Sequence, residues 1–414
     1  MTAASPRIAA MDVLRGCAVM GILWMNITAF ALPQTAYFNP RAAGPLSAGD
    51  MLFWLVSFLF FDGKMRALFS MLFGASMLLL IDREEMSGRD GRRAQIIRLA
   101  WLFVFGLAHY MLLWSGDILM TYALVGLAAL FFVRKEPLTL VKWAFLFFLI
   151  HFLICAAFMA SLHGWAHAAA APDAAASVRE AFASFTGSYT DPRHPVIRAE
   201  IATYRSGFST ILRHHLVLFP TEWPWTFLFS GWDTLGFMLL GMAMLKGGFL
   251  MGRWEPHLYL RTFRHCFLIG LPPMIALAAW LMWKGFPPLP ALGAALAWSF
   301  PFRIPLAVGW AALILWLFAR YRDLTITGRI AGVGRLALSN YLGSSLVMCA
   351  IFYGWGLSLF AQVRPAQLPL LVLGAWPVML IWSTIWLSRF AIGPAEWLWR
   401  SLIKGSPQKI RKSS

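Results

Sequence analysis

A histidine and an aspartate stand on either side of a short turn between two apolar segments. His109 lies near the end of one segment, and Asp117 begins the next, with Tyr122 five residues further on. Because the turn is so short, we expect these side chains to meet near the outer face of a membrane. A carboxylate can orient an imidazole ring and stabilise its charged form, as a general base requires. The alternative is structural: Asp117 caps a helix and His109 hydrogen-bonds within the bundle.

Three charged residues, Asp62, Lys64 and Arg66, interrupt a long apolar segment at residues 51–81. Asp62 and Arg66 are four residues apart, so on one helix they share a face and can pair, while Lys64 points elsewhere. If 51–81 is a single helix, the cluster lies inside the membrane and can clamp a phosphate or a carboxylate. Alternatively, the first part lies along the outer interface and the span begins near Met65, which leaves Asp62 and Lys64 among the headgroups.

Further polar residues lie in the first and ninth apolar segments. Asp12 and Arg15 are three residues apart at the start of the first segment, where a local ion pair or a headgroup contact is common. Asn26 lies deeper and either bridges helices or contacts a substrate. Asn340 and Tyr341 open the ninth segment, where interhelical hydrogen bonding is the ordinary role of such residues. Together with the preceding clusters, these residues complete the candidate substrate-binding set.

The histidines and cysteines do not indicate a metal site. His163 and His167 are four residues apart, but the stretch between them lacks the glutamate of H-E-x-x-H, and His214 and His215 are simply adjacent. The four cysteines have no C-x-x-C spacing and all fall in apolar stretches: Cys17, Cys155, Cys266 and Cys349.

The elements that position these residues are membrane spans. Of 414 residues, 60% are hydrophobic and 13% charged, which is outside the range of soluble domains. A span needs about 20 mostly apolar residues. On that criterion we predict an all-α, polytopic membrane bundle of about ten transmembrane helices, at residues 13–31, 51–81, 97–113, 117–133, 140–161, 225–245, 263–283, 301–319, 336–360 and 368–387.

The charge distribution predicts the orientation. The net charge is +17, and most of the 35 lysines and arginines fall in alternate loops, which we assign to the cytoplasm together with both termini. Topology therefore explains the basic charge without a nucleic-acid partner, and membrane lipids are the expected partner. The whole chain, 1–414, is predicted to be one integral-membrane domain. A long extracytoplasmic loop at 163–224 divides five spans from five, and 401–414 is a basic cytoplasmic tail that can touch anionic lipid.

Several of these residues fall in a pattern that resembles the YeiB-like family of bacterial inner-membrane proteins, known as the domain of unknown function DUF418. The resemblance implies a multi-pass protein of the bacterial inner (plasma) membrane. It extends over nearly the whole chain outside the long loop, and its matching stretches are residues 11–27, 62–74, 101–126, 334–356 and 393–400.

The opening Asp12-x-Leu14-Arg15-Gly16 also looks like the entry motif of transmembrane acyltransferases of the heparan-glucosaminide acetyltransferase type. Those enzymes pass an acyl group from cytosolic acyl-CoA to an acceptor on the far side. The likeness implies acyl-CoA as a co-substrate, with no bound cofactor, and His109 as the base that deprotonates the acceptor. It also implies that basic residues hold the CoA, namely Arg15, Lys64 and Arg66. The loop at 32–50 departs from that type, because it lacks the histidine that those enzymes carry there.

Three functions stay open at this point. The working hypothesis is an acyltransferase that modifies a hydroxyl or amine of a small molecule or glycan outside the cytoplasm. The alternative is a secondary transporter or exporter with a site at the membrane midplane, formed by Asn26, Asp62, Lys64 and Arg66. A membrane scaffold without a substrate is the third. Whether the protein is an enzyme is therefore left undecided by the sequence.

Overall fold

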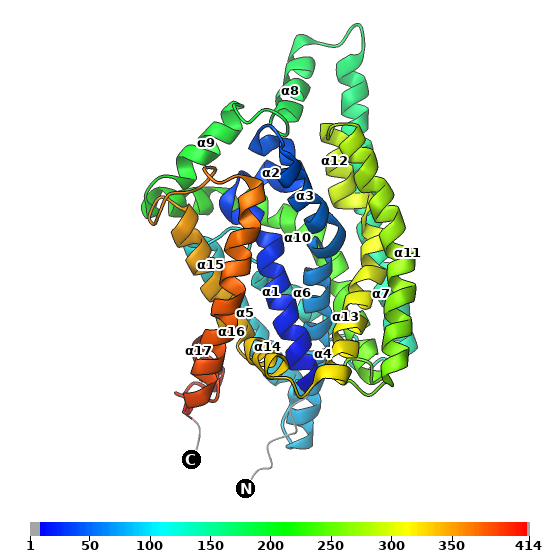
Figure 1. The fold of residues 1–414 in the computed structure, drawn as a ribbon, viewed down its shortest axis with the longest axis vertical. Helices are drawn as coiled ribbons and strands as arrows, with labels where there is room; N and C mark the ends of the chain where they lie inside the picture. The colour runs from blue at the N-terminus through cyan, green and yellow to red at the C-terminus, as the bar shows by residue number, and fades with distance from the viewer. Residues whose placement is uncertain (1–8, 412–414) are drawn as a thin grey trace.

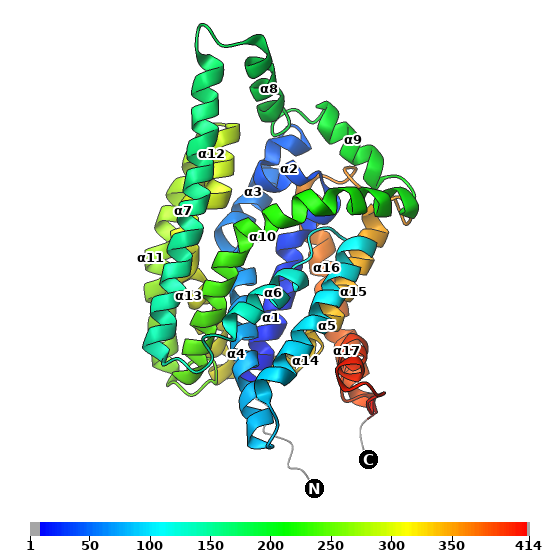
Figure 2. The same ribbon diagram turned by 180° about the vertical axis from the view of Figure 1, so that it is seen from behind.

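Apolar segments of this length fold as helices because a backbone away from water must satisfy its polar groups internally. The computed structural model describes residues 9–411, and these form a bundle of helices (Figures 1 and 2). Both ends of the described chain lie at the same end of the bundle, which we call the terminal end; the opposite end is the far end. The prediction of an all-helical fold is confirmed.

Among residues 9–411, eight helical segments are long and apolar enough to cross a membrane, with α3 and α4 counted as one segment. A ninth candidate is a bent pair, α14 (Thr325–Arg335) and α15 (Ala337–Phe352), whose axes meet at 81°. The eight are α1 (Ala9–Ala31), α3 with α4 (Ala48–Val56 and Lys64–Met86), α5 (Gly91–Leu112), α7 (Pro137–Ala170), α10 (Phe208–Lys246), α11 (Pro256–Trp283), α13 (Phe300–Tyr321) and α16 (Leu368–Arg389).

The expected count of ten is thus larger than the eight or nine candidates found among residues 9–411. The fourth predicted span holds only α6 (Leu119–Ala129), whose 11 residues are too few to cross a bilayer alone. It is preceded by irregular chain and followed by a turn at 130–135. The ninth predicted span ends at Phe352 rather than 360, because the next residues fold as turns. Hydropathy measures only composition and therefore does not detect these breaks.

The overlong segment at 51–81 is two helices, not one. A π-helix, η2 (Ser57–Phe61), follows α3, and the chain then turns at Asp62 and Gly63 before α4 begins. Gly63 has a φ of 73°, which suits glycine and interrupts a right-handed helix. Asp62 therefore stands outside α4, and the expected pairing of Asp62 with Arg66 on one helix face is wrong. The second predicted arrangement, in which the span begins near Met65, matches this break, because α4 begins at Lys64.

The segment at 163–224 is mostly helical. α7 continues to Ala170, and α8 (Ala176–Gly187) and α9 (Pro195–Tyr204) follow at the far end (Figure 2). α10 first runs across the bundle and then bends to descend along it, and its two internal prolines, Pro220 and Pro224, lie in the first half of the helix. α2 (Gln34–Phe38) and α12 (Pro288–Gly293) also lie toward the far end.

The predicted basic tail is tied back to the bundle for most of its length. α17 (Pro394–Lys404) follows α16 near the terminal end, and the backbone N–H of Ala391 donates to the carbonyl of Ile410 at 2.9 Å. Residues 412–414 of the tail lie outside the described part of the chain.

At the terminal end α14 packs directly on α1 through glycines. A Cβ atom on Gly334 would lie 1.8 Å from the carbonyl oxygen of Asp12, and one on Gly16 would lie 2.2 Å from that of Ile330. Only glycine permits this approach of two backbones. The contact fixes the end of α1 that carries Asp12 and Arg15 against the α14–α15 bend.

We expect Gly334→Ala to destabilise the protein, because the added methyl group overpacks this contact, at a cost of about 1–3 kcal/mol. Gly328→Ala on the same helix is the matched control, since a Cβ there meets nothing within 4 Å. Thermal unfolding of the detergent-purified protein measures both. Equal melting temperatures for the two variants would contradict the close contact.

α9 is held to α2 by a partly buried carboxyl group. The Glu200 side chain accepts a hydrogen bond from the backbone N–H of Gln34 at 2.9 Å. Burial raises the pKa of Glu200 from 4.5 to about 7; the hydrogen bond from Gln34 lowers it, and the charge of Glu222 adds to the rise. Between pH 4.5 and about 7, Glu200 therefore keeps its proton in the folded protein, whereas the unfolded chain releases it. The resulting stability is present at low pH and is lost as the pH rises from 4.5 through 7.

On raising the pH from 5 to 8, the melting temperature should fall more in the wild type than in Glu200→Gln, by roughly 2 °C. Glu180→Gln, on exposed α8, serves as the control and should follow the wild type. The same pH dependence in wild type and Glu200→Gln would show that Glu200 does not keep its proton.

Candidate functional site

The structure brings His109 and Asp117 together. The Nδ1 atom of His109, near the end of α5, lies 2.8 Å from a carboxylate oxygen of Asp117, which precedes α6. The other oxygen of Asp117 accepts the backbone N–H of Met120 at 2.9 Å. Asp117 therefore does both jobs considered from the sequence: one oxygen caps α6 and the other holds the imidazole.

The second ring nitrogen of His109 is left available. Its Nε2 atom is buried and has no hydrogen-bond partner among residues 9–411. The side chain is only 2% exposed, and the ring of Tyr341 packs against it with centroids 5.1 Å apart. When Asp117 accepts the proton on Nδ1, Nε2 carries the free lone pair, as a general base requires.

A cavity of about 300 Å³ approaches this pair from the terminal end. We call it the arginine cavity, because four arginines line it: Arg15, Arg98, Arg335 and Arg400. Ile118, Tyr122 and Tyr341, which lie deeper in the bundle, line it as well. Arg98 and His109 are both on α5, and their separation of 11 residues corresponds to roughly 16 Å along the helix. The cavity thus connects a basic end with the tyrosine that covers His109.

The arginines are held at their positions by specific contacts. Arg15 forms an ion pair with Asp12 at 2.9 Å, as the local spacing allowed, and donates a second hydrogen bond to the Ser76 hydroxyl at 3.1 Å. The Arg98 guanidinium lies over the ring of Trp399, 4.4 Å from its centroid. The excess of positive charge suits a ligand that carries several negative charges, such as a phosphorylated one.

Glu396 organises the inner part of this cavity. One of its carboxylate oxygens accepts the backbone N–H groups of Leu338 and Ser339, at 2.8 and 3.1 Å, and the other accepts the Ser339 hydroxyl. An acidic side chain from α17 thus satisfies the first N–H groups of α15 and complements its dipole. This contact positions α15, and with it Tyr341, beside His109.

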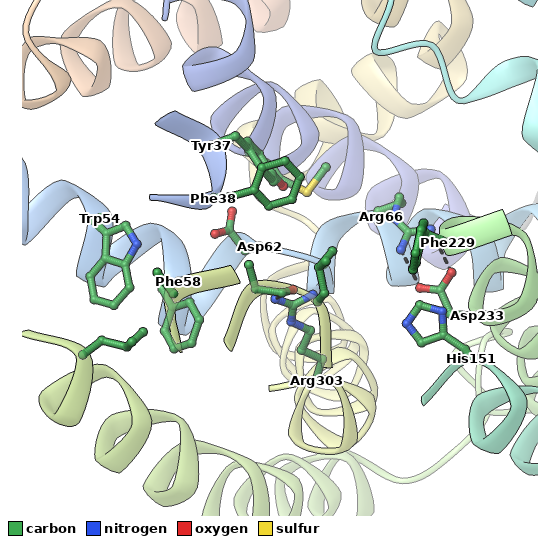
Figure 3. Close-up of a pocket in the computed structure, with 16 residues that line it drawn as sticks. Tyr37, Phe38, Trp54, Phe58, Asp62, Arg66, His151, Phe229, Asp233 and Arg303 are labelled. Atoms are coloured by element: carbon green, nitrogen blue, oxygen red, sulfur yellow. Dashed lines mark hydrogen bonds and ion pairs between the residues drawn. The ribbon is translucent and has the colours of Figure 1, made fainter. Parts of the chain in front are cut away.

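A second cavity, of about 150 Å³, lies in the middle of the bundle (Figure 3). We call it the central chamber. Arg66 lines it and pairs with Asp233 of α10 through both carboxylate oxygens, and it also donates to the Thr234 hydroxyl at 2.8 Å. The other polar residues that line it are Tyr37, Asp62, His151 and Arg303. The chamber therefore contains both signs of charge.

A thin wall separates the chamber from the arginine cavity. The hydroxyl groups of Ser70 and Tyr122 lie 2.7 Å apart, and both are within hydrogen-bonding distance of the Arg66 carbonyl oxygen. Tyr122 lines the arginine cavity, whereas Arg66 lines the chamber. This wall thus joins two groups of residues predicted from the sequence, because Tyr122 belongs to the group of His109 and Asp117, and Arg66 to the group of Asp62 and Lys64.

Six of the candidate residues line neither cavity: His109 and Asp117 themselves, Asp12, which pairs with Arg15, and Asn26, Lys64 and Asn340. Lys64 is fully buried, and its ammonium group donates to the carbonyl of Phe58. Asn340 is saturated with hydrogen bonds at the α14–α15 bend, where it donates to Val333, Leu336 and Ser383 and accepts from Trp382. Asn26 is buried within α1 and lines neither cavity. For Asn340 the interhelical role matches the structure.

Comparison with known proteins now decides the family. The sequence profile described as "Protein of unknown function (DUF418)" matches residues 244–406. The chain is 31% identical over 410 residues to the "Uncharacterized protein YeiB" of Escherichia coli (strain K12), with 98% of each chain covered. It is 30% identical over 426 residues to the "Uncharacterized protein YxaH" of Bacillus subtilis (strain 168), covering 100% of this chain and 98% of the relative. The chain belongs to the YeiB-like DUF418 family. No solved structure matches it.

Several residues of this YeiB-like protein's cavities were missed by sequence reasoning. Asp233 carried a usable signal, because an acidic residue inside a predicted span is a functional candidate by default. Arg303 and Arg98 were read as topology markers at the ends of spans, and Glu396 only as part of the family pattern. Their contacts join elements far apart in the sequence, so no local spacing reveals them.

The histidines of the far end keep separate roles. His163 is hydrogen-bonded to the carbonyl of Met159 at 2.7 Å, and His215 to that of Met111 at 3.1 Å. Within residues 9–411, no group of three or more His, Cys, Asp or Glu residues is placed to hold a metal ion.

Asp233→Leu should destabilise the protein by roughly 3–5 kcal/mol, because it leaves the Arg66 charge buried without its partner. Arg66→Met combined with Asp233→Leu should recover most of that loss, since neither charge then remains. Thermal unfolding of the two variants and of wild type measures this. A double variant no more stable than Asp233→Leu would contradict the assignment of the pair.

Proposed function

We propose that this protein is an acyltransferase of the bacterial inner membrane, which moves an acyl group from cytosolic acyl-CoA to an acceptor reached from the other side. The observation that carries the proposal is the arginine cavity, which runs from four arginines to the tyrosine that covers the His109–Asp117 pair. Such a reaction requires a site for a polyanionic donor and a base, and the arginine cavity and the His109–Asp117 pair, which adjoin through Tyr341, suit these two roles.

In this proposal the arginines bind the phosphates of the donor. Guanidinium groups bind phosphate in bidentate fashion, and four of them gathered at one end of a cavity match the several phosphates of CoA. The acyl thioester would then extend toward Tyr122 and Tyr341. Lys64, which the likeness to acyltransferases had implied for CoA binding, lies outside the cavity, and Arg66 lies behind its wall.

His109 is proposed to activate the acceptor. Its Nε2 atom takes the proton from the acceptor hydroxyl or amine while Asp117 stabilises the imidazolium that results. The acceptor oxygen or nitrogen then bonds to the acyl carbon, the carbon–sulfur bond breaks, and the proton passes to the CoA thiolate. Because Tyr341 covers the ring, the reaction requires this side chain to move aside.

A secondary transporter or exporter is the second candidate, and the central chamber favours it. Charged residues in the middle of an apolar bundle often form a solute site. In that case the solute would cross the wall of Arg66, Ser70 and Tyr122, and His109 would have no chemical role. The two functions differ in whether an acyl donor binds.

Acyl-CoA binding to the purified protein in nanodiscs tests the proposal by calorimetry, with acetyl-CoA and a longer acyl-CoA as probes. We expect saturable binding that weakens about tenfold or more in Arg98→Gln, because a charge-assisted contact to phosphate is lost. His109→Gln should bind the donor as wild type does but lose acyl transfer to water or an added amine.

Arg179→Gln, on the exposed surface of α8, is the matched control for loss of one positive charge. Its binding should equal that of wild type. Absence of binding by every acyl-CoA would refute the acyltransferase and leave the transporter as the better candidate.

A further inference from the structure

We propose that the central chamber binds a small zwitterionic solute, of the size and charge of a short amino acid. The inference concerns binding alone, so it holds whether the solute is the acceptor of an acyl group or the cargo of a transporter. It rests on the volume of the chamber, on its charges and on its access.

The volume of the chamber sets the size of the solute. An engineered cavity of about 150 Å³ in another protein holds benzene, a ligand of about six non-hydrogen atoms. The central chamber has about the same volume. It therefore fits a molecule such as alanine and is too small for a nucleotide, a disaccharide or an acyl chain with its headgroup.

Two of the four charges in the chamber neutralise each other. Arg66 and Asp233 form a two-point ion pair, so neither needs a ligand. Asp62 and Arg303 remain, and they are not paired with each other. Within residues 9–411 the Asp62 carboxylate, which lines the chamber, feels the positive charges of Lys64 and Arg303 but forms no direct hydrogen bond or ion pair with either.

Arg303 is only partly satisfied. One Nη atom donates to the carbonyl of Ala295 at 2.8 Å, whereas its buried Nε atom has no hydrogen-bond partner among the described residues. Figure 3 shows the Asp62 carboxylate and the Arg303 guanidinium both at the chamber, with no hydrogen bond or ion pair drawn between them. A carboxylate without a hydrogen bond and a partly satisfied guanidinium in one buried space are costly, and a ligand that hydrogen-bonds to both lowers that cost.

A zwitterion completes this arrangement. Its ammonium group would face Asp62, where Trp54 and Phe58 add aromatic surface that favours a cation. Its carboxylate would face Arg303. The four charged side chains that line the chamber balance, so a ligand without net charge leaves that balance unchanged, while the buried Lys64 ammonium beside Asp62 is held by the carbonyl of Phe58.

Access to the chamber comes from the far end. A narrow cavity of about 30 Å³ shares Tyr37, Trp54 and Asp62 with the chamber. It continues between α1, α2 and α3. Its lining also includes Pro40, which follows α2, and Pro365, which precedes α16. The solute would thus enter from the side opposite the arginine cavity and meet the wall formed by Arg66, Ser70 and Tyr122.

Binding of L-alanine, β-alanine and taurine to the purified protein in nanodiscs tests the proposal. Propionate and ethylamine, each with one of the two charges, are the comparison probes. We expect at least one zwitterion to bind at least tenfold more tightly than either fragment. In Asp62→Asn the ammonium group has no partner, so the zwitterion should bind no more tightly than propionate. In Arg303→Gln the carboxylate has no partner, so the zwitterion should bind no more tightly than ethylamine.

Asp191→Asn and Lys284→Gln remove the same charges from exposed far-end positions and should bind as wild type does. Arg303→Lys, which keeps the charge, should retain part of the binding and so separates loss of charge from misfolding. The proposal is overturned if no zwitterion binds, or if zwitterion and fragments bind equally. Acetyl-CoA binding measured in the same variants is expected to be unchanged, which separates this outcome from failure of the acyltransferase proposal.

Discussion

The buried ion pair between Arg66 and Asp233 is the constraint on which the site depends. An unpaired charge inside an apolar bundle is costly, so α4 and α10 must meet in the one register that joins these two side chains. The backbones permit this because a Cβ on Gly241 would lie only 1.9 Å from the carbonyl oxygen of Met71. The pair also fixes the start of α4, since Arg66 follows the turn at Gly63. Both cavities then form on either side of this point.

The wall between the cavities follows from the same geometry. The Arg66 side chain is engaged by α10, and its carbonyl oxygen lies within reach of the Ser70 and Tyr122 hydroxyl groups. One residue therefore belongs to the chamber through its side chain and to the wall through its backbone. Tyr122, which lines the arginine cavity, is thus hydrogen-bonded to the residue whose side chain lines the chamber. The arginine cavity and the central chamber thus adjoin on the two sides of one wall, an arrangement that suits the passage of a chemical group or a solute from one cavity to the other.

Much of this arrangement could be predicted from the sequence, and the rest could not for physical reasons. The helical class and the meeting of His109 with Asp117 depend on local hydropathy and on a short turn, both of which the sequence contains. The partner of Arg66 does not follow from local spacing, because the turn at Gly63 moves Asp62 off the helix and a residue 167 positions away replaces it. The role of Glu396 is hidden for the same reason, since its backbone partners on α15 are defined only by the fold.

The positions of the polar residues argue against a mere scaffold. Asn340 and Glu396 satisfy backbone and side-chain groups around them, as structural polar residues do. His109 and Arg303 do not: among the described residues, each retains a buried nitrogen without a hydrogen-bond partner, and the Asp62 carboxylate lines the chamber. Burying such atoms costs free energy that a purely structural role would not recover. Their cost is explained if each atom meets a group that the protein itself lacks, which is the condition for binding or catalysis.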